Sequence, residues 1–374
     1  MQMGIIFKTE KLPEALRKLF IADGNKRYPG KERSPWFDKE EEDRSYRDVS
    51  QNIWMNPSGA ANQFFDPVTI ERIRATTIRP PKYSGTLKFD YDNSPTNFGK
   101  KILNVVFVNN SRGILKWWGE LEEIKNVLRP NQLNNYIIGC DISFGTGASN
   151  STAMITNRNT GELIGELVTP DMRVDEFADV VSALYFWLGG ANDPFVIWER
   201  TGGHGINFGR RIMENGVTNV YTKTTETGKM RKRQQVYGWD NTGGPNGTKG
   251  DLLERLEIAL KEGLKEKRSR TFLIIHSEEV TNEMDGYIFY SSGELDSSES
   301  IDQSSGARKR HGDRIIGVGL CVLGMLDQPV AEETLSKDPP YGSLAWRMLQ
   351  AKIEDDRRSS GRWDDPPDLE TRWK

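Results

Sequence analysis

The chain contains few of the residues that build Cys/His metal sites and disulfide frameworks. Its 374 residues include two cysteines, Cys140 and Cys321, and three histidines, His204, His276 and His311. Both cysteines lie inside apolar runs, as small core residues do, and the histidines have no ligand-like spacing. The sequence therefore argues against a zinc site and a disulfide scaffold, and it favours a reducing compartment.

Long apolar runs, a large net charge and internal repeats are also missing. No apolar stretch reaches the roughly 18 residues of a membrane span, and the N-terminus lacks the apolar core of a signal peptide. We therefore expect a soluble, intracellular protein. The formal net charge of -3 neither demands nor excludes a nucleic-acid partner. Any surface for DNA must then be a local basic patch.

The composition changes along the chain and predicts four parts. Residues 1–81 are polar with little apolar content, which indicates an N-terminal extension or a linker remnant. Residues 82–130 alternate between apolar and polar and predict a small β-rich lead-in. Residues 131–326 have the regular pattern of a main domain. Residues 327–374 carry paired prolines and mixed charge, as a flexible C-terminal tail does.

The main part predicts an α/β fold with a mixed sheet. Three strands in a meander are followed by helix, strand, helix and strand, which places helices on the faces of a sheet. Strands are expected at 136–143, 153–157, 163–168, 195–198, 217–221 and 271–275, and helices at 174–188, 206–215, 251–265 and 314–326. In the lead-in, residues 120–127 are expected to form a short helix.

Asp141 is the residue of the first strand in this domain whose charge is unfavourable to bury. It interrupts the apolar run Tyr136–Ile142 and is followed by Ser143-Phe144-Gly145-Thr146-Gly147. A carboxylate in or beside a buried strand must be compensated, most simply by a cation. The glycines after it let the backbone turn tightly or approach a ligand. Asp141 is therefore the first candidate for a functional residue.

Two further carboxylates occupy the same kind of position. Glu199 follows the apolar strand Phe195–Trp198, and Asp313 opens the last apolar helix. Each of these acids stands where an apolar element meets a glycine-containing loop, and in α/β sheets ligands bind at such strand ends. Three gathered carboxylates would repel unless a cation were bound. Oxygen ligands without His or Cys select hard cations such as Mg²⁺ or Mn²⁺.

Each acid also has a structural interpretation. Asp141 could be a turn or capping residue, Glu199 could pair with Arg200 or Arg210 at the surface, and Asp313 could be the N-cap of its helix. Only the arrangement of all three favours a functional site.

A basic segment completes the candidate set. Residues 223–233 are expected to form a loop with one acid among its basic residues, and a basic residue also stands at the start of the helix near residue 250. By default such a charge run is a solvated surface; alternatively it neutralises phosphates. The candidate residues are Lys223, Lys229, Arg231, Lys232, Arg233 and Lys249.

Five short motifs occur in a characteristic order. They are Gly139-Cys140-Asp141-Ile142-Ser143 with Gly145 and Gly147; Trp198-Glu199-Arg200 with Gly203; the segment from Gly238-Trp239 to Thr248-Lys249-Gly250; Glu279 with Tyr287; and Gly312-Asp313-Arg314-Ile315-Ile316. In this order they resemble the nuclease domain of the large terminase subunit of tailed bacteriophages. Ser34-Pro35-Trp36-Phe37 and the segment from Gly59 to Asp66 resemble the stretch that joins ATPase and nuclease domains in that family, so the resemblance covers roughly residues 30–326.

The resemblance implies an RNase H-like fold and a metal-dependent endonuclease that cuts concatemeric viral DNA during genome packaging. Asp141, Glu199 and Asp313 would be the catalytic, metal-binding acids for two Mg²⁺ or Mn²⁺ ions. Lys249 and the basic segment would face double-stranded DNA. Portal, a small terminase subunit or a separate ATPase part would be further partners, with no membrane, in the cytoplasm of the infected host.

The chain departs from that family in two respects. The phosphate-loop motif G-x-x-x-x-G-K-[ST] does not occur, so the chain is expected to be a fragment, a split-gene product or an engineered piece, and translocation is not assigned to it. The family often has two adjacent acids where this chain has Gly312-Asp313. One acidic ligand would then be missing, which leaves open whether a second metal ion binds.

Two other functional classes therefore stay open. One is a non-catalytic DNA-binding or docking subunit. The other is an actin-like or sugar-kinase-like phosphotransferase, which the Asp141 to Gly147 segment superficially resembles but which needs a second phosphate loop that the sequence does not show.

Overall fold

The computed structural model describes most of the first 327 residues. The chain divides into two compact units, Met1–Asp327 and Gln328–Lys374, and every described residue belongs to the first. The described residues are 39–40, 43–44, 49, 63–92, 101–124, 127–190, 192–227, 232–241, 248–268, 271–289, 295–297, 305–307 and 312–327. Within them, no helix has the length and apolar character needed to cross a membrane.

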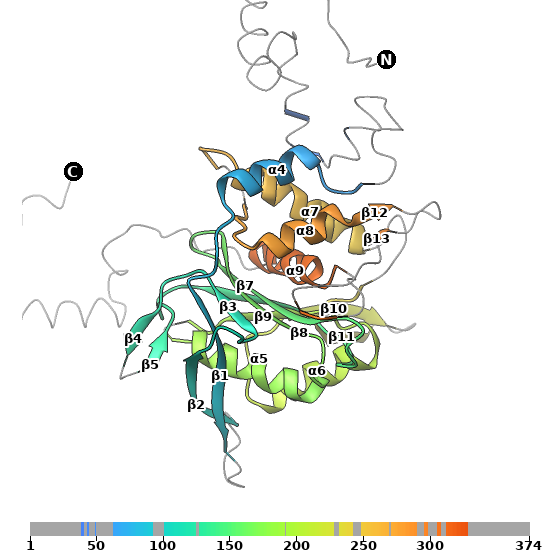
Figure 1. The fold of residues 1–374 in the computed structure, drawn as a ribbon. Helices are drawn as coiled ribbons and strands as arrows, with labels where there is room; N and C mark the ends of the chain where they lie inside the picture. The colour runs from blue at the N-terminus through green and yellow to red at the C-terminus, as the bar shows by residue number, and fades with distance from the viewer. Residues whose placement is uncertain are drawn as a thin grey trace, which may run out of the picture. The chain divides into compact units, whose positions relative to one another are not determined.

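A seven-stranded mixed sheet forms the centre of the described unit (Figure 1). Its strand order is β2-β1-β3-β8-β7-β6-β9, and all neighbours are antiparallel except β6 and β9, which run parallel. The strands are β1 (Tyr83–Tyr91), β2 (Ile102–Asn109), β3 (Leu115–Trp117), β6 (Tyr136–Asp141), β7 (Ser151–Asn157), β8 (Glu162–Thr169) and β9 (Phe195–Trp198). The meander β6–β7–β8 with a parallel fourth strand beside β6 is the arrangement of an RNase H-like sheet, so the predicted fold class is confirmed.

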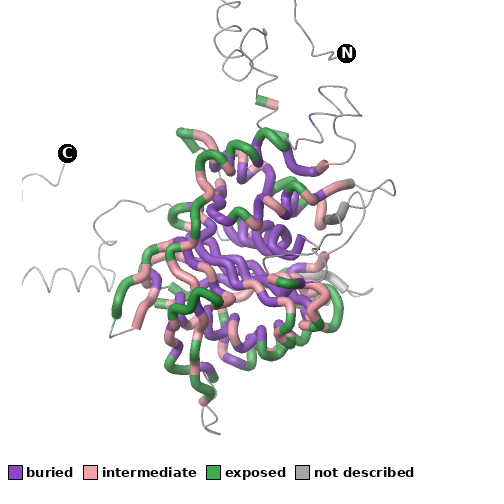
Figure 2. Tube along the Cα trace, viewed as in Figure 1, coloured by how far each residue is buried: buried purple, intermediate pink, exposed green. Residues whose placement is uncertain are grey.

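Six helices are described, and they lie on both faces of this sheet. They are α4 (Pro67–Thr76), α5 (Val174–Leu188), α6 (Gly202–Glu214), α7 (Thr248–Gly263), α8 (Glu278–Asp285) and α9 (Asp313–Asp327). Helices α5 and α6 cover one face, and α9 covers the other beneath α7, α8 and α4 (Figure 1). The sheet divides the core into two apolar clusters, one on each side. Strands β6, β7, β8 and β9 and helix α9 are the most continuously buried parts of the fold (Figure 2).

The close contact between α9 and β6 depends on glycine. A Cβ atom on Gly139 in β6 would lie 2.1 Å from the carbonyl oxygen of Gly317 in α9, which no side chain could tolerate. Because glycine stands there, the helix backbone lies directly against the strand. Helix α9 is buried along most of its length, so apolar contacts fix its position, and its first residue comes to lie near the end of β6.

Three small hairpins complete the described structure. They pair β4 (Glu122–Ile124) with β5 (Val127–Arg129), β10 (Thr222–Thr227) with β11 (Lys232–Tyr237), and β12 (Tyr287–Phe289) with β13 (Leu295–Ser297). The helix expected at 120–127 is therefore wrong, because that segment enters the first hairpin. The loop expected at 223–233 is also wrong in its described residues, which enter the second.

Two expected strands are reduced to single bridges. Residues 217–221 contact β9 through one bridge between Val196 and Val220, and residues 271–275 contact β8 through one bridge between Glu162 and Ile274. Both segments lie beside the sheet, but neither continues the pairing far enough to form a strand.

Candidate active site

Asp141 and Glu199 leave the sheet at the same edge. Asp141 is the last residue of β6, and Glu199 directly follows β9. The two strands are parallel neighbours with Cys140 opposite Trp198, and the Glu199 N–H donates to the Cys140 carbonyl oxygen at 2.9 Å. Because parallel strands end at the same edge of a sheet, Asp141 and Glu199, the next residues after this pair, come side by side there.

Strand alternation sends both acids toward the face that α9 covers. Ile137 and Ile197 pack in the apolar cluster on the α9 side, whereas Cys140 and Trp198 pack in the cluster on the other side. Side chains two residues apart along a strand share a face. Asp141 therefore shares the face of Ile137, and Glu199 continues the face of Ile197.

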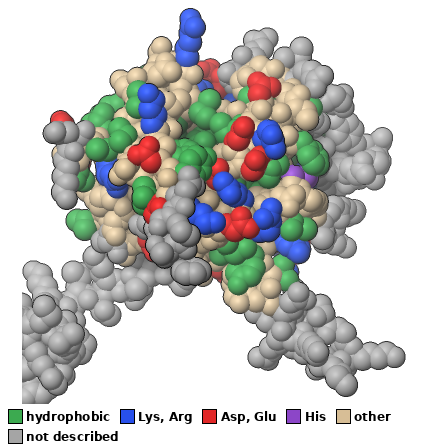
Figure 3. Space-filling view, turned by 90° about the horizontal axis from the view of Figure 1, so that it is seen from below, with side chains coloured by type: hydrophobic (Ala, Val, Ile, Leu, Met, Phe, Trp, Pro, Cys, Tyr) green, Lys and Arg blue, Asp and Glu red, His purple; other side chains and the backbone are tan. Residues whose placement is uncertain are grey.

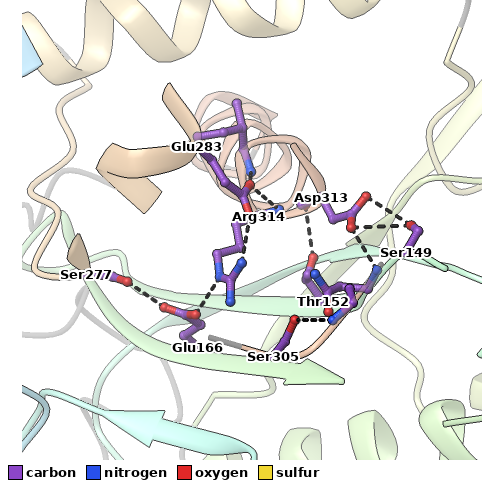
Figure 4. A network of polar contacts seen from close by, with 11 residues as sticks. Ser149, Thr152, Glu166, Ser277, Glu283, Ser305, Asp313 and Arg314 are labelled. Carbon is purple, nitrogen blue, oxygen red and sulfur yellow. Dashed lines mark hydrogen bonds and ion pairs between the residues drawn. The ribbon is translucent and has the colours of Figure 1, made fainter. Parts of the chain in front are cut away.

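Asp313, the first residue of α9, is held against the neighbouring strand. Its carboxylate accepts hydrogen bonds from the Asn150 N–H at 2.8 Å and from the Ser149 hydroxyl at 3.3 Å to each oxygen (Figure 4). Its carbonyl oxygen accepts from the Thr152 hydroxyl at 3.1 Å, and Thr152 is paired with Asp141 across β6 and β7. The third acid is thereby fastened to the strand residue that lies directly beside the first.

The arginines that could have paired with Glu199 have other partners. Arg200 pairs with Asp240 at 2.9 Å, and Arg210 pairs with Glu214 at 2.7 Å. Glu199 instead accepts a hydrogen bond from the Asn241 side-chain amide at 3.1 Å. The side-chain partner of Glu199 at the sheet edge is thus an amide and not an arginine.

The three acids act on one another electrostatically. The pKa of Asp141 is raised well above its ordinary value, first by burial and then by the negative charges of Glu199 and Asp313. The Ile142 N–H and the positive charge of Lys249 oppose this rise but do not cancel it. Within the described ranges, no group of three or more His, Cys, Asp or Glu side chains is arranged tightly enough to hold an ion as it stands. The acids are therefore close enough to repel but are not drawn together.

Tyr287 occupies the space where a second acid was expected beside Asp313. Gly312 has a φ of 75°, a conformation that favours glycine, and a Cβ atom there would lie 2.2 Å from the Tyr287 ring. An acidic side chain at residue 312 is therefore sterically excluded in this fold. Lys249, in the first turn of α7, places its Nζ atom 5.5 Å from the centroid of the same ring. The predicted cation Lys249 thus lies at the acid cluster.

A buried charged network next to Asp313 was missed by the sequence analysis. Arg314 donates through Nε to Glu166 and through a terminal guanidinium nitrogen to Glu283, both at 2.7 Å, and the three side chains are at most 1% exposed. The Ser277 hydroxyl also donates to Glu166 at 2.6 Å (Figure 4). The signal was present as charged residues inside apolar elements, but the sequence does not show which of them meet.

The hairpin that contains the predicted basic segment has its base beside β9 and Glu199. Residue Val220 bridges to β9, and Trp239 bridges to Glu199 itself, so the β10–β11 hairpin leaves the sheet next to this acid. Lys223 is exposed on β10, and Lys232 and Arg233 lie on β11. Two predicted DNA-facing residues, Lys229 and Arg231, lie outside the described residues.

Comparisons with known proteins find similarity among solved structures. No protein-family model matches the chain, and no curated protein matches it. The large terminase nuclease of thermophilic phage G20c is 10% identical, with a TM-score of 0.39 over 68% of this chain and 96% of that one. The Thermus phage P74-26 large terminase nuclease domain is 10% identical, with a TM-score of 0.38 over 68% and 93% of the two chains.

A third similar structure is a mutant nuclease domain of the large terminase subunit gp2 of bacterial virus Sf6, with manganese and beta-thujaplicinol. It is 13% identical, with a TM-score of 0.34 over 51% of this chain and 89% of that one. The resemblance that the sequence motifs predicted is found again in the solved structures to which this chain is similar.

Proposed function

We propose that this protein is a divalent-metal-dependent endonuclease that hydrolyses double-stranded DNA during packaging of a phage genome. One observation carries the proposal. Carboxylates from β6, the end of β9 and the start of α9 lie at one edge of the sheet, and burial together with the charges of Glu199 and Asp313 raises the pKa of Asp141. A cation is the simplest partner for such a group of charges.

The donor set fits a hard divalent cation. Asp141, Glu199 and Asp313 offer carboxylate oxygens alone, as Mg²⁺ and Mn²⁺ prefer. To share an ion, the three carboxylates would have to draw closer together than they stand in this structure. Divalent ions held there would supply activation of the attacking water and stabilisation of the leaving 3′-oxygen in phosphodiester hydrolysis.

The chain's own residues have distinct roles in this proposal. Asp141 would be the central metal-binding acid, and Glu199 and Asp313 would be the other two carboxylates that hold divalent ions. Ser149 and Asn241 orient the carboxylates of Asp313 and Glu199 through the hydrogen bonds described above. Lys249 and the basic hairpin would neutralise DNA phosphates without reading sequence.

The wider setting belongs to the same proposal. Cleavage of concatemeric DNA would take place in the cytoplasm of the infected host, with portal, a small terminase subunit or a separate ATPase part as partners. Calorimetric binding of ions without DNA cleavage would point instead to a non-catalytic DNA-docking subunit.

Nicking of supercoiled plasmid with Mn²⁺ or Mg²⁺ tests the activity. Asp141→Ala should lower the nicking rate by more than about 100-fold, because even the hydrogen-bonding partners of metal ligands are worth about 10- to 100-fold. Glu123→Ala is the matched control, since it removes an exposed acid on β4, whose partner strand β5 contacts β2 at the opposite edge of the sheet from β9. Nicking by Asp141→Ala at the wild-type rate would show that the site is wrongly assigned.

A further inference from the structure

A large aromatic side chain is exposed three residues after Asp141. Phe144 is 66% exposed, and its ring lies against the imidazole of His204 with 4.6 Å between centroids and 62° between planes. Single exposed apolar residues are common on proteins, so exposure alone carries little meaning. Two further features of Phe144 indicate a functional role: its position beside Asp141 and the edge-on contact of its ring with a second ring.

The two rings come from the two segments that carry the acids. Phe144 follows β6 and Asp141, whereas His204 lies in the first turn of α6, which follows β9 and Glu199. Since β6 and β9 are parallel neighbours, both segments leave the sheet at one edge. The ring contact therefore joins these segments close to the acid cluster.

The backbone around Phe144 is fixed by hydrogen bonds. The Ser143 N–H donates to the Ser151 hydroxyl at 3.0 Å, and the Gly145 N–H donates to the Ser143 hydroxyl at 3.3 Å. Two residues later the Gly147 N–H donates to the Pro170 carbonyl oxygen at 3.0 Å. A ring held outward on a fixed segment is ready to contact a partner without first paying the entropy of ordering a loop.

We propose that Phe144, supported by His204, stacks on a nucleobase of the DNA beside the bond that is cut. This inference rests on the proposed endonuclease function. An uncharged aromatic face gains little from phosphates, but it binds the face of any base, so it suits an enzyme that does not read sequence. An apolar wedge at a base step also partly unstacks a duplex, which would open the backbone toward the acids.

Short duplexes that carry 2-aminopurine test the proposal, because this base fluoresces more strongly when it is unstacked. The parent protein is the full chain with Asp141→Asn, which blocks cleavage. Binding of the parent should raise the fluorescence. Adding Phe144→Ala should abolish the rise and weaken duplex affinity about 5- to 160-fold, the range expected for removal of one base-stacking aromatic. Phe144→Trp should retain both properties.

Leu133→Ala is the matched control. Leu133 is 73% exposed and precedes β6, so it stands near the opposite end of that strand from Asp141, and its removal should change neither readout. His204→Ala should give an intermediate loss that His204→Phe restores, since a second ring again supports Phe144.

The failure of this inference can be told from the failure of the proposed function. A wild-type protein that nicks no plasmid would refute the endonuclease function, while the fluorescence experiment still reads base contact. If Phe144→Ala binds and unstacks the duplex as Leu133→Ala does, the stacking role is overturned. A parent protein that binds no duplex overturns it as well.

Discussion

At the scale of single residues, Asp141 is a carboxylate in surroundings that disfavour its charge. Burial and two neighbouring acids raise its pKa, and the N–H of Ile142 and the charge of Lys249 offset this only in part. Ionisation of Asp141 therefore costs folding free energy as the pH rises from the ordinary carboxyl pKa toward its value in the fold. A residue that weakens the metal-free fold is expected where a ligand supplies the missing charge.

Asp141→Asn should therefore stabilise the protein in the presence of a chelator. At neutral pH we expect Tm to rise by a few degrees, as a change of about 1 kcal/mol produces in a domain of this size. The gain should shrink as the pH falls toward about 4, where the wild-type carboxyl becomes protonated in both the folded and the unfolded states. Thermal unfolding of wild type and Asp141→Asn at a series of pH values measures this difference in Tm.

Addition of Mg²⁺ should reverse the order of the two proteins. Wild type gains stability with ion concentration because the ion binds the folded state, and Asp141→Asn gains less. A lower Tm for Asp141→Asn in chelator would contradict the crowding of charge at this residue.

At the scale of elements, α9 is the part that places the third acid. Its first two residues point to different partners: Asp313 meets Ser149 and Asn150, and Arg314 meets Glu166 (Figure 4). Glu283 accepts from the backbone N–H of Arg314 at 3.0 Å and so satisfies a donor of the helix N-terminus. The start of α9 is thereby tied to β8 and α8 as well as to the segment before β7.

Arg314→Met should destabilise the protein by about 3–5 kcal/mol, because it leaves Glu166 and Glu283 buried without their cation. The pKa of Glu166 supports this direction: burial alone would raise it, yet the positive charges of Arg314 and Lys116 and the hydrogen bonds keep it lowered. A lowered carboxyl pKa contributes stability above its ordinary value, near 4.3, and loses it as the pH falls. Chemical denaturation above and below that pH measures both effects.

Arg314→Lys separates positioning from stability. Lysine keeps the positive charge but lacks the planar guanidinium that donates to Glu166 and Glu283 at once, so the start of α9 and Asp313 would be held less firmly. The folded variant should therefore bind Mg²⁺ about 10- to 100-fold more weakly in calorimetry. Exposed Arg210, which pairs with Glu214, gives the matched control Arg210→Lys. Equal denaturation midpoints for wild type and Arg314→Met would refute the stabilising role of the network.

The elements also indicate how far sequence reasoning reaches. Helix 174–188 and strand 195–198 have the predicted bounds. Each contains enough apolar residues at the spacing of a helix or strand for the sequence pattern alone to identify it. The sequence predicts a loop where the β10–β11 hairpin lies, because its strands are rich in Thr, Lys and Gln and lack apolar alternation. Both of its ends are anchored beside β9, and no local pattern in the sequence records that contact.

The candidate site likewise contains residues that the sequence identifies and contacts that it does not. Asp141, Glu199 and Asp313 could be named from sequence because each interrupts or ends an apolar element before a glycine. The meeting of Arg314 with Glu166, 148 residues away, could not be, since it depends on the register of β8 against α9. The roles of the three acids in catalysis and of the basic residues in DNA binding stay predictions.

At the scale of the whole molecule, the near-neutral net charge means that the proposed DNA binding would depend on local features. On the face beyond α5 and α6, basic and acidic side chains are interspersed among the described residues (Figure 3). Mixed charge of this kind gives a duplex little long-range attraction. The β10–β11 hairpin differs, because it carries Lys223, Lys232 and Arg233 on an element whose base adjoins β9 and Glu199.

Neutralising this hairpin should therefore lower both DNA affinity and its dependence on salt. In Lys223→Gln/Lys232→Gln/Arg233→Gln, the slope of log K against log salt should become shallower by about 0.9 for each phosphate that is no longer neutralised, and so by up to about 3. The matched control is Lys88→Gln/Lys101→Gln/Arg112→Gln. It removes two lysines and one arginine, all exposed, around β1 and β2 at the opposite edge of the sheet, and should leave the slope unchanged. Duplex titrations at several salt concentrations measure the slopes, and equal slopes for the two triple variants would place the DNA on another surface.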